Sequence, residues 1–179
     1  MLDFEKQNYN IVSSEKTEIG RFEIVYDTIE QDGNNYPYSY VKMKRGVGVL
    51  GLVGDSVILL RQYRYIWNSW MWEIPGGMVD DNEEPEAAAI RELKEETGFQ
   101  AEKIKSLGIC YPSIGATTEL QYLYLAECER TSEQSLDSLE KINVVLVKTD
   151  EFERMIRDNE FSHGMGLAAW VRYKEMKVL

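Results

Sequence analysis

The sequence predicts an α+β fold, or a mixed three-layer arrangement, in which helices flank a mixed β-sheet. Pairs of short β-forming segments separated by turn residues indicate antiparallel strands, and three later segments have the spacing and boundary residues of helices. The chain has 179 residues, of which 44% are hydrophobic, and this suffices for one compact domain with a small appended piece.

The first predicted β region lies within residues 1–45. The segment RFEIVYDTI (21–29) alternates partly and is rich in β-formers, QDGNN supplies a turn, and YPYSYVKMKR resumes as a strand. We expect an antiparallel hairpin that is too small to bury a core of its own and must dock on another surface.

A second hairpin is expected from Val47–Val53 and Ser56–Tyr63, joined by a turn at Gly54 and Asp55. Its apolar density indicates the central part of a sheet. A group of aromatic residues follows and is interpreted mainly as core packing between sheet and loops. These residues are Tyr63, Tyr65, Trp67, Trp70 and Trp72.

The first helix is expected from Pro85 to Thr97, because proline favours a helix start and Gly98 follows its end. The remaining chain predicts strands near 104–109, 119–126 and 142–148, and helices near 150–158 and 164–176.

Composition excludes several classes of function. The formal charge of −11 argues against a general nucleic-acid surface. No window approaches the ~18 uninterrupted apolar residues of a membrane span, and the start, MLDFEKQNYN, does not resemble a signal peptide, so a cytoplasmic protein without membrane contact is expected. Cys110 and Cys128 are expected to be reduced and near the core, and His163 to be structural.

Glu92, Glu95 and Glu96 stand at i, i+3 and i+4 of the first helix, so their carboxylates share one face, while Leu93 and Thr97 fall on another. Such a face is typical either of a solvated acidic surface or of a site for a hard cation such as Mg²⁺.

The surrounding pattern decides between these interpretations. The segment GMVDDNEEPEAAAIRELKEETGF (77–99) resembles the Nudix box at every defined position and spacing. The matching residues are Gly77, Glu83, Arg91, Glu92, Leu93, Glu95, Glu96, Gly98 and Phe99. The resemblance implies a Nudix-type α/β/α sandwich with a mixed sheet over residues 46–179, with residues 1–45 as a dimerisation region.

The resemblance also implies roles for these residues. Glu92 and Glu96, assisted by Glu95 and the backbone carbonyl of Gly76, would bind Mg²⁺, with Mn²⁺ as a substitute. Gly76 stands where many members carry alanine.

Gly77 would permit a tight loop, and Gly98 would end the helix. Arg91 would pair with Glu83 and orient the metal ligands, and we group it with the catalytic residues Glu95 and Glu96.

Outside the box the chain resembles the ADP-ribose pyrophosphatase branch in RQYR (61–64), WEIPGG (72–77) and YPSIGATTELQYLYLAE (111–127), although Ile114 stands where the branch often has proline. Arg61, Arg64, Trp72 and Glu73 are the candidate substrate-binding residues. The arginines would contact phosphate or ribose, or alternatively form a structural ion pair with a carboxylate.

That branch usually carries its general base on an acidic loop before an Ile-x-Val strand. In LDSLEKINVV (136–145) the matching residue is Glu140, with Asp137 as the nearest alternative. The alternative interpretation is that Glu140 is a solvated loop carboxylate without a catalytic role.

The resemblance implies hydrolysis of ADP-ribose to AMP and ribose 5-phosphate by a homodimer that exchanges its N-terminal region. Alternatives are another nucleoside diphosphate derivative, such as a GDP-sugar, NADH or a dinucleoside polyphosphate, or a Nudix-fold sensor that binds a nucleotide sugar without cleaving it. The sequence leaves the exact substrate, the number of metal ions and the physiological role open.

Overall fold

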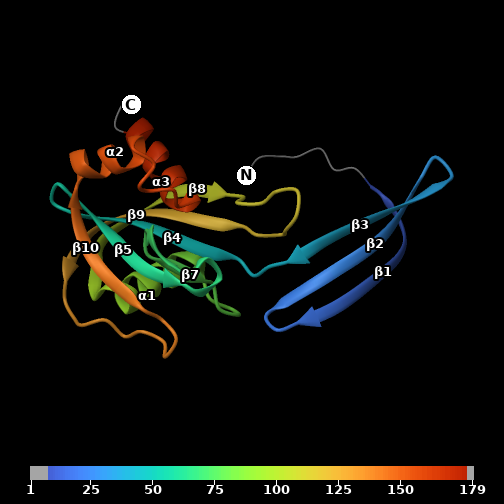
Figure 1. Ribbon diagram of the computed structural model, residues 1–179, viewed down its shortest axis with the longest axis horizontal. Helices are drawn as coiled ribbons and strands as arrows, with labels where there is room; N and C mark the ends of the chain where they lie inside the picture. The colour runs from blue at the N-terminus through green and yellow to red at the C-terminus, as the bar shows by residue number, and fades with distance from the viewer. Residues whose placement is uncertain (1–7, 177–179) are drawn as a thin grey trace. The chain divides into compact units, whose positions relative to one another are not determined.

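The computed structural model describes residues 8–176, which form two compact units (Figure 1). One unit comprises the chain up to Lys44 together with Ser113–Glu119, and the other comprises Arg45–Pro112 and the chain from Leu120 onward. Residues 1–7 of the predicted N-terminal region lie outside the described residues. The assignment of residues 1–45 to dimerisation remains a prediction.

The N-terminal unit is built on an antiparallel sheet of three strands, β1 (Asn10–Ile19), β2 (Phe22–Gln31) and β3 (Asn34–Lys42). Asp32 and Gly33 join β2 to β3 with φ angles of 53° and 77°. Two successive positive φ angles match the right-handed twist of a hairpin, and this explains the turn predicted at QDGNN.

Two features of this unit were not predicted. All ten residues of β1 are exposed, so its sequence shows no alternation of buried and exposed positions. The segment Ser113–Glu119 belongs to the same unit, since the Val41 N–H donates to the Ala116 carbonyl and the Thr118 N–H donates to the Val41 carbonyl, both at 3.0 Å.

The second unit is built on a seven-stranded sheet. Five strands follow the order β10-β5-β4-β9-β8, and the other two, β6 and β7, pair with β5 and β4. The strands are β4 (Gly46–Val53), β5 (Ser56–Arg64), β6 (Ser69–Glu73), β7 (Gly76–Met78), β8 (Phe99–Cys110), β9 (Gln121–Arg130) and β10 (Ile142–Lys148). Strands β4 and β9 are parallel and the other pairs are antiparallel. The mixed sheet predicted from the sequence is confirmed.

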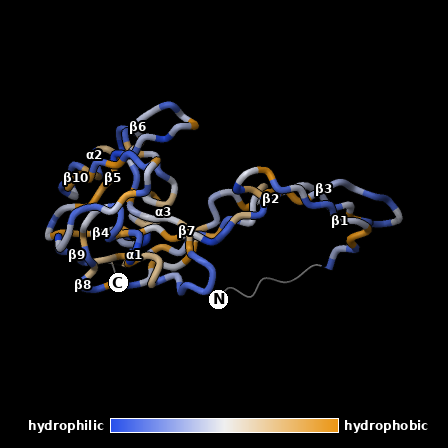
Figure 2. The backbone as a smooth tube through the Cα atoms, turned by 90° about the horizontal axis from the view of Figure 1, so that it is seen from below, coloured by the Kyte–Doolittle hydropathy of each residue, from blue (hydrophilic) through white to orange (hydrophobic). Residues whose placement is uncertain are grey.

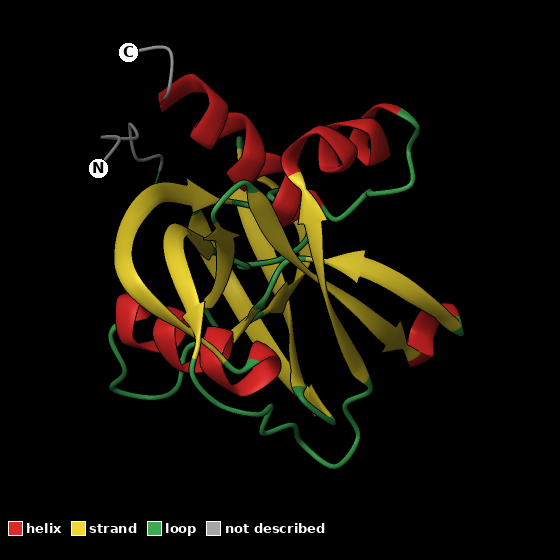
Figure 3. Ribbon diagram, turned by 90° about the vertical axis from the view of Figure 1, so that its left-hand side faces the viewer, coloured by secondary structure: helices red, strands yellow, loops and turns green. Residues whose placement is uncertain are grey.

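Helices cover both faces of this sheet (Figure 3). Helix α1 (Pro85–Thr97) packs on one face, and α2 (Thr149–Arg157) and α3 (Gly164–Met176) pack on the other. Neighbouring residues of β5 serve the two cores, because Ile58 packs with the α1 side and Leu59 with the α2–α3 side. Hydrophobic residues follow the strands at the centre of this unit (Figure 2). The predicted α/β/α sandwich is therefore confirmed.

The sheet divides between β4 and β5. These strands are registered at Leu52↔Val57 and Val53↔Ser56, and further along each takes another partner. Strand β5 pairs with β6 as far as Leu60↔Glu73, and β4 pairs with β7 from Gly48↔Gly76. The chain therefore crosses from one strand to the other within Ile74 and Pro75, directly before the predicted metal-binding glycine.

The predicted bounds of α1, α3 and β10 coincide with those observed, and α2 begins and ends one residue earlier than predicted. Strands β8 and β9 are longer than expected. Cys110 and Cys128 are free, as predicted, and burial raises the pKa of Cys128 to about 11. Among residues 8–176 no helix is long and apolar enough to cross a membrane.

The end of α1 yields a test of stability. Gly98 has φ 74°, and a Cβ added there would lie 2.3 Å from the Ser132 carbonyl oxygen. Gly54 has φ 60° but no atom within 4 Å of an added Cβ. Gly54→Ala should cost about 1 kcal/mol in free energy of unfolding, the penalty of a left-handed alanine. Gly98→Ala should cost about 2–4 kcal/mol, because the 131–134 segment must also move. Urea denaturation measures both, and equal losses would contradict the contact.

Candidate active site

The most buried charged group of α1 is the Glu96 side chain. The residue is 4% exposed, and Oε2 accepts a hydrogen bond of 2.7 Å from the Gly76 N–H. Burial raises the pKa of Glu96 to about 8, the Gly76 hydrogen bond opposes this shift, and the negative charges of Glu92 and Glu140 add to it. The ionised form of Glu96 would therefore be stabilised by a positive charge next to it.

Two glycines bring β7 close to its neighbours. A Cβ at Gly77 would lie 2.4 Å from the Glu92 carboxyl carbon, and a Cβ at Gly76 would lie 2.2 Å from the Val47 carbonyl oxygen. The absent side chains let the strand lie directly against both β4 and the carboxylates of α1. Gly77 thus meets a steric requirement in addition to permitting the predicted loop.

Arg91 connects the box glutamates. Its Nε and Nη2 donate to the two carboxylate oxygens of Glu83, each at 2.9 Å, and this hydrogen bonding lowers the pKa of Glu83 to about 2. Its Nη1 donates to Glu92 at 2.8 Å and to Glu95 at 3.0 Å, and Nη2 also reaches the Met78 carbonyl. The predicted pairing with Glu83 is present, and the same guanidinium holds two of the predicted metal ligands.

The chemistry of these donors fits a hard divalent cation. Three glutamates of one helix turn supply carboxylate oxygens, and the buried Glu96 carboxylate receives its hydrogen bond from a neutral amide. Among residues 8–176, however, no three His, Cys, Asp or Glu side chains are gathered as a metal centre, and the guanidinium of Arg91 forms ion pairs with Glu92 and Glu95. Their role as metal ligands remains a prediction.

The segment between β9 and β10 is bound to the end of α1. The Gln134 side chain donates to the Glu96 carbonyl at 2.7 Å, and the Ser135 N–H donates to the Glu95 carbonyl at 2.8 Å. Further along, Glu140 is half-buried and accepts a hydrogen bond of 2.9 Å from the Asp137 N–H. Burial raises the pKa of both Glu92 and Glu96, and the negative charge of Glu140 adds to both shifts, so Glu140 lies within electrostatic range of them. Asp137 is exposed.

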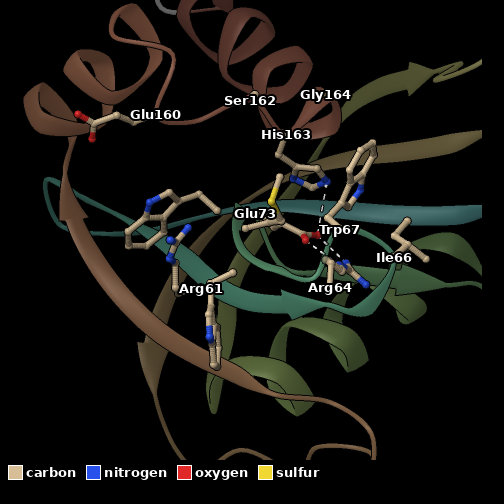
Figure 4. A pocket seen from close by; sticks show the side chains of 12 residues that line it. Arg61, Arg64, Ile66, Trp67, Glu73, Glu160, Ser162, His163 and Gly164 are labelled. Atoms are coloured by element: carbon tan, nitrogen blue, oxygen red, sulfur yellow. Dashed lines mark hydrogen bonds and ion pairs between the residues drawn. The ribbon is translucent and has the colours of Figure 1, made fainter.

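Figure 4 shows a pocket of about 440 Å³ in the same unit. Residues of β5, β6, the 3₁₀ helix η1 (Tyr65–Trp67) and the α2–α3 connection form its walls. All four candidate substrate-binding residues line it: Arg61, Arg64, Trp72 and Glu73.

Arg61 and Arg64, the two arginines that line this pocket, have different partners. The Arg61 guanidinium lies over the Trp72 ring at 5.0 Å, in cation–π contact. Arg64 forms a bidentate pair with Glu73, with distances of 2.6 and 2.5 Å, and this is the ion pair left open as the alternative. Neither geometry excludes a further contact with a ligand, since Arg64 is 44% exposed in its side chain.

The interpretation of the aromatic group as core packing is wrong for several of its members. Tyr65 is 88% exposed and Trp67 68% exposed, because η1 is a surface turn between β5 and β6. Trp67 and Trp70 line the pocket instead. No local sequence pattern distinguishes Trp67 and Trp70 as pocket residues, and none marks Gln134 as a partner of α1.

Comparisons with known proteins identify the family. The NUDIX domain profile matches residues 42–169. The chain is 31% identical over 140 residues to an ADP-ribose pyrophosphatase of Bacillus subtilis (strain 168), covering 76% of this chain and 75% of that protein. It is 30% identical to a GDP-mannose pyrophosphatase of Enterobacter sp. (strain 638), covering 80% and 82% of the two chains.

A solved structure described as an ADP compounds hydrolase superposes with a TM-score of 0.84, covering 97% of this chain and 96% of that one. At 22% sequence identity this likeness shows the shared fold. Together with the profile match and the intact box on α1, these similarities establish that the chain belongs to the Nudix family.

Proposed function

We propose that this Nudix protein is a pyrophosphatase that cleaves the diphosphate of a nucleotide sugar, converting ADP-ribose to AMP and ribose 5-phosphate. The observation that carries the proposal is the position of the box carboxylates next to an arginine-lined pocket. Burial raises the pKa of Glu96, and the positive charge of Arg64 opposes this shift, so the two groups lie within electrostatic range.

The pocket suits the parts of such a substrate. A diphosphate is anionic and would be attracted by Arg61 and Arg64, while Trp67 and Trp70 offer aromatic faces to a base or sugar ring. The similarity to an ADP-ribose pyrophosphatase supports the adenine nucleotide, and the similarity to GDP-mannose pyrophosphatases makes a GDP-sugar the second candidate.

We further propose that Glu92, Glu95, Glu96 and the Gly76 carbonyl hold Mg²⁺. When bound, such an ion would neutralise diphosphate charge and lower the pKa of water. Arg91 would keep Glu92 and Glu95 oriented through its present hydrogen bonds. Glu140 would accept the proton of the attacking water at a carboxylate oxygen, with the Asp137 N–H holding the carboxylate in position.

Substrate and metal dependence can be tested together. With Mg²⁺ or Mn²⁺ the protein should release AMP and ribose 5-phosphate from ADP-ribose, and EDTA should stop the release, because without a bound cation the box carboxylates would repel the diphosphate. Chromatographic analysis of the products is the measurement. A kcat/KM for GDP-mannose or dinucleoside polyphosphates ten times that for ADP-ribose, about 1.4 kcal/mol in transition-state binding, would contradict the adenine assignment.

Glu96→Gln should lower kcat by at least ~10², the order attached to removing a key electrostatic group from a site. The matched control is Glu86→Gln on the first turn of the same helix, where the side chain is exposed and kcat should remain within twofold of wild type. Circular dichroism checks folding of both variants. Near-normal turnover of Glu96→Gln would contradict the assignment of Glu96 as a metal ligand.

We also propose a homodimer in which the partner's N-terminal unit contributes to the active site. This unit has a hollow lined by apolar side chains, including Ile19, Phe22 and Val41, and exposes Tyr36 and Tyr38. Static light scattering at micromolar concentration should give about twice the 20.8 kDa chain mass. A monomer mass would refute the proposal.

A further inference from the structure

The crossing from β6 to β7 leaves one backbone donor without a strand partner. Glu73 pairs with Leu60 on β5, and Gly76 pairs with Gly48 on β4. Of the two residues between them, Pro75 has no N–H, and its carbonyl accepts a hydrogen bond of 2.8 Å from Val49. The Ile74 N–H therefore needs another acceptor, since Ile74 is only 2% exposed and water does not reach it.

His163 supplies that acceptor. The Ile74 N–H donates to its Nδ1 at 3.2 Å, so in the neutral ring the proton is carried by Nε2. Burial lowers the pKa of His163 and favours the neutral form, in which Nδ1 can accept. The side chain is 17% exposed.

The other edge of the same ring faces Glu73. His163 Nε2 lies 3.9 Å from the Glu73 carboxylate that binds Arg64 (Figure 4). One imidazole is thus next to the last residue of β6 on one side and to the first residue of the crossing on the other.

The segment that carries His163 is itself firmly packed. His163 lies between α2 and α3, with its ring edge-on to Phe161 at 6.3 Å. A Cβ at Gly166 would lie 2.5 Å from the Phe161 ring and 3.3 Å from the Ile74 side chain, so the first turn of α3 packs directly on both. The histidine is therefore anchored in the core and not on a free loop.

We propose that His163 is a positioning residue for hydrolysis: it holds the Ile74–Pro75 crossing so that the Gly76 N–H meets Glu96 and the Glu73 carboxylate meets Arg64. The role rests on the proposed function but needs no contact between His163 and the reacting atoms. Its hydrogen bond links the α2–α3 connection to the crossing between β6 and β7.

The test compares His163→Leu, which removes the acceptor, with His163→Asn, whose Oδ1 occupies about the place of Nδ1. Glu175→Gln, at an exposed position of α3 outside the pocket, is the control. His163→Leu should lower kcat for ADP-ribose about 10²-fold, the order attached to misplacing catalytic groups by about 1 Å, with KM within threefold of wild type. His163→Asn should recover at least about tenfold of this loss, and Glu175→Gln should stay within twofold of wild type.

A second measurement is independent of turnover. Hydrogen exchange of the Ile74 amide, followed by NMR in metal-free protein, should be fast in His163→Leu and slow in wild type and His163→Asn. Unchanged Ile74 protection in a folded His163→Leu variant would overturn the proposal, as would a rise confined to KM, which would make His163 a substrate contact. A wild-type protein that cleaves no nucleotide sugar would instead refute the proposed function, and the exchange result would stand apart from it.

Discussion

The active-site region depends on one steric constraint: β7 must lie against β4 and α1 with no side chain between them. Gly76 and Gly77 meet this constraint, since each would place a Cβ inside the contact distance of a neighbouring carbonyl or carboxylate. The close approach allows the Gly76 N–H to reach Glu96 and leaves Glu92 beside the strand. Strands β4 and β5 separate after Leu52 and Val57, and β7 pairs with β4 beyond that point. The separation of these strands therefore determines both the topology of the sheet and the position of β7 beside the carboxylates.

The excess of acidic residues is handled locally. A chain with a formal charge of −11 places three glutamates on adjacent positions of one helix face, where like charges are unfavourable. Arg91 compensates Glu92 and Glu95, whereas burial raises the pKa of Glu96. Near neutral pH a pKa of about 8 favours the protonated, uncharged form of Glu96, which reduces the repulsion between like charges on this helix face. Arg61 and Arg64 line the pocket together with Glu73, which pairs with Arg64.

Local signals explain which parts the sequence predicted well. Helix α1 has proline at its start and glycine at its end, and its bounds and shared carboxylate face could be predicted from spacing alone. Strand β1 was missed because an exposed strand has no hydrophobic alternation. The aromatic residues near Trp67 were assigned to the core because composition does not distinguish a buried ring from one that lines a pocket. Gln134 contacts Glu96, 38 positions earlier in the chain, and His163 contacts Ile74, 89 positions earlier. No local sequence pattern encodes contacts over such separations.

The β5–β6 hairpin combines a ladder of fixed register with an exposed turn at its end. Its ladder from Leu60↔Glu73 to Arg64↔Ser69 fixes the register of Glu73, while the turn beyond it, Tyr65–Asn68, is exposed and contributes Ile66 and Trp67 to the pocket wall. Residues can be exchanged or inserted in that turn without altering the register below it. A few exposed residues can therefore change the shape of the pocket wall while α1 and β7 keep their positions.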